Sequence, residues 1–169
     1  MPNPTKWPPQ RSSKWKTQKK LGNNQGAMNG GIYIISDKAT GKAYIEKVAT
    51  PGEVQRETIE VEIDILKQLK GKNDFVVQIA DYWLDKKALQ GGVILEYCTK
   101  GSLETLIEKH RQYKRPISEQ WLWRWASQLS GGLACCHYGP TYRDTDIDGT
   151  EWDFIIHRGK CMEVRDCAI

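Results

Sequence analysis

Residues 50–70 constrain this sequence most, because they combine a helix start with a periodic apolar stripe. Thr50 suits the N-cap position, Pro51 the first helical position, and Glu53 the third, where its carboxylate can close a capping box. The apolar positions that follow recur at helical spacing: Ile59, Ile63, Leu66 and Leu69, with Ile65 beside them. A helix with one buried face is therefore predicted over residues 50–70.

Strand-like segments lie on both sides of this helix. Residues 32–35 and 43–48 flank the polar stretch SDKATGK, which predicts a hairpin. Residues 74–84 and 91–98 predict two more strands, with turn residues in DKKALQGG between them. The sheet should therefore hold at least four strands.

Two further helices are predicted after the last strand. Ser102 caps a short helix through Glu108, and Ser118 caps a longer one that ends near Tyr138. Residues 139–154 are polar and turn-rich, which predicts a loop. The order of strands, helix, strands and helices predicts an α+β small lobe followed by the first helices of a second, helical lobe.

The start of the chain differs from the rest in charge and composition. Residues 1–20 hold six Lys or Arg, no acidic residue and four of the seven prolines. We expect residues 1–19 to form a disordered basic tail, with at most weak contact to nucleic acid. No apolar run reaches the length of a membrane span or a secretory signal, so we expect a cytoplasmic or nuclear protein without a membrane partner. The five cysteines are odd in number and scattered, which favours reduced thiols.

Five motifs follow one another between residues 20 and 164: LGNNQGAMNGGIY, AYIEKV, EIDIL, VILEYCTKGSLETLI and HRGKCMEV. In this order they resemble the N-terminal half of a eukaryotic-type (Ser/Thr) protein kinase domain, degenerate and truncated. The resemblance implies that residues 20–98 form a kinase-like small lobe and hinge. It also implies that residues 99–169 form a partial large lobe with two helices and a degenerate catalytic loop.

The first motif resembles the loop whose glycines let backbone N–H groups approach nucleotide phosphates. Gly30 takes the last glycine position, but Gln25 and Ala27 stand at the two earlier ones. A flexible hairpin loop without a ligand is the alternative. By resemblance, four residues are assigned to the nucleotide: Gly22, Gly26, Gly30 and the strand residue Ile32.

The second and third motifs resemble the kinase lysine that pairs with nucleotide phosphates and its glutamate partner on the following helix. Lys47 stands at the lysine position and Glu62 at the glutamate position. The resemblance implies an ion pair between them, whereas each residue alone could be an ordinary surface charge. Ile45 stands where the family usually has a small residue against the adenine ring, so it would narrow the pocket.

The fourth motif resembles the hinge, where backbone groups of an extended segment hydrogen-bond the adenine edge. Leu95 would be the gatekeeper beside the pocket, and Glu96, Tyr97 and Cys98 would form the hinge. An ordinary strand-to-helix connection is the alternative.

The fifth motif departs from the family at the catalytic loop, which reads His157-Arg158-Gly159-Lys160. Gly159 stands where the catalytic aspartate belongs, and glycine can neither accept a proton nor orient a hydroxyl group. Lys160 could still approach a phosphate, although one residue is missing before it. Glu163 stands where an asparagine would hold magnesium.

The sequence ends at Ile169, before the segment that would supply the main magnesium ligand. The resemblance therefore implies weak ATP binding, poor magnesium binding and no useful phosphoryl transfer. No residue is assigned to a metal site, because the cysteines and histidines near the C-terminus match no standard zinc spacing. The three residues Trp121, Trp123 and Trp125 lie two apart on a predicted helix, so Trp121 and Trp125 should share a face while Trp123 points the other way. With only part of a large lobe to cover them, one of these two faces should be exposed, which implies a protein partner, a dimer or poor stability.

Three hypotheses remain at the level of sequence. The chain is a degenerate relative of Ser/Thr kinases with a partial nucleotide pocket, a non-catalytic interaction module, or a truncated product without an enzymatic role. Nucleotide affinity would separate the first two hypotheses.

Overall fold

The computed structural model describes residues 7–21, 30–99, 101–140 and 152–155. The chain divides into two compact units, residues 1–68 with 78–97 and residues 69–77 with 98–169. The first unit contains the β-sheet and the helices that follow its third strand, and the second contains the two later helices.

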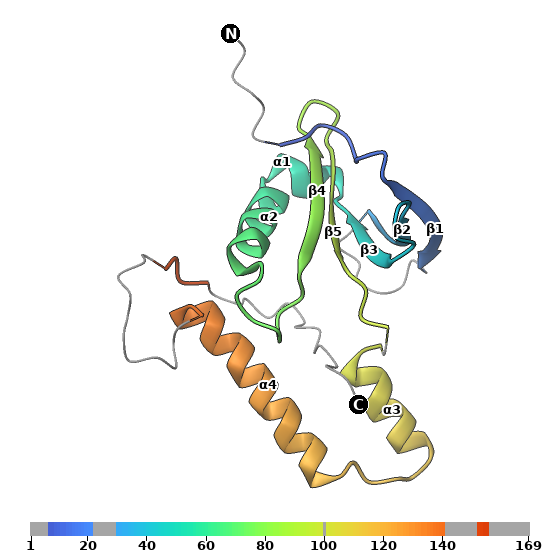
Figure 1. Cartoon of the computed structure of the whole chain (residues 1–169), viewed down its shortest axis with the longest axis vertical. Helices are drawn as coiled ribbons and strands as arrows, with labels where there is room; N and C mark the ends of the chain where they lie inside the picture. Colours follow the sequence, from blue (N-terminus) through green and yellow to red (C-terminus); the bar gives the residue numbers. More distant parts are fainter. Residues whose placement is uncertain (1–6, 22–29, 100, 141–151, 156–169) are drawn as a thin grey trace. The chain divides into compact units, whose positions relative to one another are not determined.

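The first unit is built on a five-stranded antiparallel sheet in the order β1-β2-β3-β5-β4 (Figure 1). The predicted hairpin is confirmed, since β2 pairs with β3 in a regular register. The strand predicted from residue 74 begins later, because the Asn73 side chain accepts a hydrogen bond from the Phe75 N–H and forms a turn there. The strand bounds are Trp15–Leu21 (β1), Gly31–Asp37 (β2), Ala43–Val48 (β3), Ile79–Asp85 (β4) and Gln90–Glu96 (β5).

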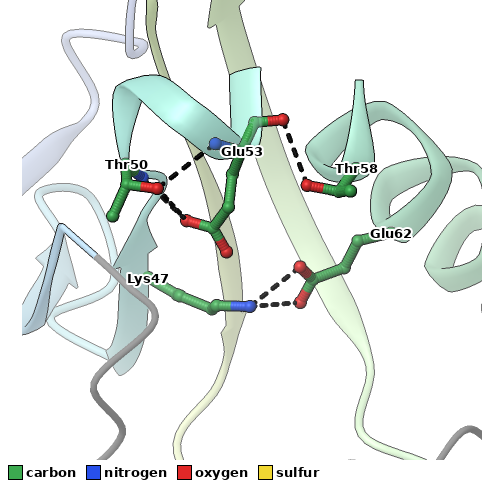
Figure 2. Close-up of polar contacts among 5 residues, drawn as sticks. All are labelled: Lys47, Thr50, Glu53, Thr58 and Glu62. Atoms are coloured by element: carbon green, nitrogen blue, oxygen red, sulfur yellow. Dashed lines mark hydrogen bonds and ion pairs between the residues drawn. The ribbon is translucent and has the colours of Figure 1, made fainter. Parts of the chain in front are cut away.

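Two helices, rather than the single helix predicted over residues 50–70, follow β3. They are α1, Pro51–Gln55, and α2, Thr58–Leu69. The prediction was wrong at Glu57, which has a φ of 59° and so interrupts the right-handed helix. The helix start was predicted correctly: Glu53 N–H donates to the Thr50 hydroxyl at 3.2 Å, and the Glu53 carboxylate accepts from Thr50 N–H at 2.7 Å (Figure 2).

Each face of the sheet carries its own apolar cluster. On the α2 face, Ile59 and Ile63 of the helix pack with Val93 of the sheet, as the predicted helical stripe requires. On the opposite face, Trp15, Ile35 and Ile94 form a second buried cluster. We call these the helix face and the outer face.

The expectation of a disordered tail over residues 1–19 is wrong for residues 7–19, whereas residues 1–6 lie outside the described part of the chain. Trp7 is only 6% exposed, and Trp15 is buried at the start of β1. Burial of two tryptophans removes a large apolar area from water, which opposes the cost of ordering a Lys- and Pro-rich segment.

The second unit contains α3, Leu103–Gln112, and α4, Glu119–Tyr138. Ser102 caps α3 as predicted, with its hydroxyl accepting from Thr105 N–H at 3.2 Å. In α4, Trp125 is buried while Trp123 is 69% exposed, so the two predicted faces differ as expected. Within the described residues, no helix has the length and apolar character needed to cross a bilayer.

Candidate functional site

An ion pair between β3 and α2 is the central polar feature of the helix face. The Lys47 amino group lies 2.8 Å from each carboxylate oxygen of Glu62 (Figure 2). The two side chains are 23% and 24% exposed, so water reaches the pair only in part. A charge-assisted contact to both carboxylate oxygens fixes the amino group more firmly than a single bond would.

Both partners are held by regular secondary structure. Lys47 lies in the middle of the sheet, where it is paired with Ile32 of β2 and with the fully buried Val93 of β5. Glu62 precedes Ile63, which anchors α2 in the core with no exposed surface. The sequence brings the two charges together because the apolar stripe of α2 turns Glu62 toward the sheet.

A second ion pair fixes the start of α2. The Lys86 amino group, in the turn between β4 and β5, lies 2.7 Å from a Glu60 carboxylate oxygen and 3.3 Å from one of Glu57. The hydrogen bond that Lys86 donates to the Glu60 carboxylate is the main cause that raises the pKa of Lys86. The first turn of α2 is therefore tied to the sheet independently of Lys47.

An apolar strip lies beside Lys47 on the helix face. Directly paired strand residues point to the same face, so Ile32 accompanies Lys47, and Ile45 accompanies Leu95. Ile32, Ile45 and Leu95 are all partly buried, and Leu95 packs against the helix-face cluster. A ligand that carries a flat apolar group and a negatively charged group could therefore contact the apolar strip with the first and Lys47 with the second.

Among the predicted loop glycines, the structure describes Gly30, whereas Gly22 and Gly26 lie outside the described residues. Gly30 N–H donates to the Val48 carbonyl at 2.8 Å, and a Cβ at this position would lie 2.9 Å from the Ala49 carbonyl oxygen. The backbone just after β3 therefore explains the absence of a side chain at Gly30 without a ligand.

Of the predicted hinge residues, Glu96 is the last residue of β5, and Cys98 follows it outside the sheet. The Glu96 carboxylate accepts from Gln78 N–H at 2.8 Å, and Glu96 N–H donates to the Gln78 carbonyl at 3.0 Å. The Glu96 side chain thus fixes the start of β4. Cys98 is partly buried just beyond β5.

The predicted catalytic loop, His157, Arg158, Gly159 and Lys160, lies outside the described residues. The chain just before it is described, and there Ile155 is buried and donates its N–H to the Cys136 carbonyl of α4 at 3.1 Å. The role assigned to Lys160 therefore stays a prediction.

The sequence analysis missed a polar site on the outer face. Glu46 is 3% exposed, and its carboxylate lies 2.5 Å from the Arg11 guanidinium and accepts from the Trp83 indole N–H at 3.1 Å. A hollow of about 490 Å³ opens on this face, lined among others by these three residues and so separate from Lys47. Because successive side chains of a strand point to opposite faces of the sheet, Glu46 lies on the face away from Lys47. No local pattern in the sequence identifies Arg11 as the partner of Glu46.

Comparisons with known proteins agree with this geometry. The sequence profile of the protein kinase domain family matches residues 15–145. The G2-specific protein kinase fin1 of Schizosaccharomyces pombe is 31% identical over 113 residues, which cover 65% of this chain and 15% of that protein. Mouse serine/threonine-protein kinase Nek2 is 28% identical over 106 residues, covering 61% of this chain and 24% of Nek2. The Arabidopsis thaliana kinase WNK8 is 31% identical over 116 residues, covering 68% of this chain and 19% of WNK8. The chain thus spans under a quarter of the length of each relative.

Proposed function

This chain belongs to the protein kinase family, and from that premise we propose that its first unit binds ATP at the helix face of the sheet. The bidentate contact between Lys47 and Glu62 is the observation that carries the proposal. In kinases a lysine held in this way contacts the α- and β-phosphates. The partly exposed amino group and the adjacent apolar strip of Ile32, Ile45 and Leu95 fit an adenine nucleotide.

We further propose that this nucleotide binding is not followed by efficient phosphoryl transfer. Gly159 stands at the position of the aspartate that accepts the proton of the substrate hydroxyl, and Glu163 stands at a magnesium-ligand position. Glycine provides no carboxylate, so the positioning and electrostatic contributions of that residue are lost. Lys47 and Glu62 would then hold a nucleotide that reacts slowly.

Isothermal titration calorimetry of the whole chain with ATP, with and without magnesium, tests the proposal. We expect saturable binding to the wild type and binding weakened by at least about tenfold in Lys47→Met, since a hydrogen bond to a charged group is lost. Lys42→Met, which removes an exposed lysine just before β3, is the matched control and should bind like the wild type. Absence of binding to a folded wild-type chain refutes the nucleotide site.

The exposed apolar side chains of the second unit favour a second candidate function, a pseudokinase-like protein-interaction module. Among the described residues of this unit, seven large apolar side chains are exposed: Ile107, Tyr113, Leu122, Trp123, Leu133, Tyr138 and Phe154. Exposed aromatic side chains are typical of protein interfaces. A photo-crosslinking amino acid at position 123 should capture one specific protein in cells, or a second copy of the chain. Crosslinking no stronger than at the exposed position 104 of α3 contradicts this function.

A further inference from the structure

The segment of residues 7–14 joins three parts of the first unit before β1 begins. We call it the N-terminal segment. At the exposed edge of the sheet, the Pro8 carbonyl accepts a hydrogen bond from Leu84 N–H of β4 at 2.8 Å. Across the outer face, Arg11 pairs with Glu46 of β3. Figure 1 shows this segment in blue, running from the region of β4 to β1.

Trp7 connects this segment to α2. Its ring is buried in the helix-face cluster, which includes Ile59 and Ile63 of α2. The same ring meets Tyr82 of β4 edge to face, with the centroids 5.8 Å apart. The Lys67 amino group lies 5.1 Å from the Trp7 ring and 4.6 Å from the Tyr82 ring.

These contacts attach the second half of α2 to the N-terminal segment. Lys67 is in the last turn of α2, while Glu62 lies near its middle, next to the buried Ile63. The start of α2 is attached separately through Lys86 and Glu60. A helix attached at both ends holds its central side chains in one place, and Trp7 is part of one of these two attachments.

We propose that the N-terminal segment controls the nucleotide site by holding α2 in the position where Glu62 reaches Lys47. Trp7 is thus a positioning residue that acts through α2, and Lys67 completes its binding site. Release of the segment would free α2 to move and would leave the Lys47 amino group without its bidentate partner. The link to nucleotide affinity rests on the proposed function, whereas the link between Trp7 and the ion pair does not.

A simpler role for the segment is protection of the β4 edge, because uncovered edge strands promote aggregation. Protection requires the Pro8–Leu84 hydrogen bond but gives no role to the contact between Trp7 and Lys67. The two roles therefore differ in what they predict for Lys47.

The test compares the whole wild-type chain with Trp7→Ala, Trp7→Phe and Lys67→Met. Pulsed acylation of lysines, read by peptide mass spectrometry, reports whether the Lys47 amino group is paired, and Lys42 in the same chain is the internal reference. Hydrogen exchange of the α2 amides reports the position of the helix. Lys67 is exposed, so Lys67→Met should fold even if Trp7→Ala does not.

Lys67→Met removes a cation that contacts two aromatic rings, and this should loosen α2. In this variant we expect the acylation rate of Lys47, relative to that of Lys42, to rise at least about threefold. Hydrogen exchange of the α2 amides should also become faster. Trp7→Ala should show a larger change, and Trp7→Phe should recover part of it. Unchanged Lys47 acylation in Lys67→Met overturns the proposal, as does a rise in Trp7→Ala that affects the whole sheet equally. A wild-type chain that binds no ATP refutes the proposed function, while the acylation result still decides the role of Trp7.

Discussion

Replacement of Arg11 by methionine should destabilise the first unit strongly, because it leaves a buried carboxylate without its cation. Glu46 is 3% exposed, and the Arg11 guanidinium lies 2.5 Å from one of its oxygens. Removal of one partner of a buried ion pair costs about 3–5 kcal/mol. We expect the lower end, about 3 kcal/mol, because the Trp83 indole still donates to Glu46 and the Arg11 side chain is 30% exposed.

Urea denaturation and thermal unfolding measure this effect. About 3 kcal/mol corresponds to a fall in Tm of about 6–12 °C for a chain of this size. Lys16→Met, on the exposed side of β1, is the matched control and should change the unfolding free energy by less than about 0.5 kcal/mol. The double variant Arg11→Met/Glu46→Gln should recover much of the loss, since the unpaired charge is gone. A loss below about 1 kcal/mol in Arg11→Met would refute the reasoning.

Two further predictions concern helix capping and thiol chemistry. Thr50→Ala removes the capping box with Glu53 and should lower the unfolding free energy by about 1 kcal/mol in urea denaturation, and an unchanged value would contradict the cap. Burial raises the pKa of the Cys135 and Cys136 thiols, so both should be alkylated by iodoacetamide at pH 8 more slowly than Cys98 when the peptides are compared by mass spectrometry. Equal alkylation of all three thiols would contradict the burial of Cys135 and Cys136. Because these two thiols have a higher pKa in the folded state than in the unfolded state, the stability that they contribute is complete below the ordinary thiol pKa and declines as the pH rises above it.

The sequence predicts the start of α1 and the buried face of α2 because that information is local. The stripe of Ile59, Ile63 and Leu69 and the capping box at Thr50 depend on neighbours three or four positions away. The break at Glu57 was missed, since a glutamate in the left-handed conformation has no distinctive sequence signal. Local chemistry thus fixes where the first helix begins and which face of the second is buried, but not where one continuous pattern divides into two helices.

Residues 7–21 were predicted poorly for the opposite reason, because their structure depends on distant partners. The lysines and prolines of this region suggest disorder, but Trp7 packs on α2 and β4, and Trp15 donates its indole N–H to Asp81 at 2.8 Å. Tryptophan in a basic, Pro-rich segment is the one local signal that could have indicated burial. The pairing of Lys47 with Glu62 was expected only because the order of motifs resembles a known family.

Neighbouring residues of β3 carry opposite charges to opposite faces of the sheet. Lys47 meets Glu62 on the helix face, and Glu46 meets Arg11 on the outer face. A slip of β3 by one residue would exchange the faces of its side chains, so Glu46 would point toward Glu62, and Lys47 toward Arg11. Both faces would then bring like charges together, which adds an electrostatic penalty to the loss of apolar packing. The N-terminal segment therefore helps to specify the one strand register in which the lysine can reach α2, and loss of Arg11 should weaken that specificity as well as the stability of the sheet.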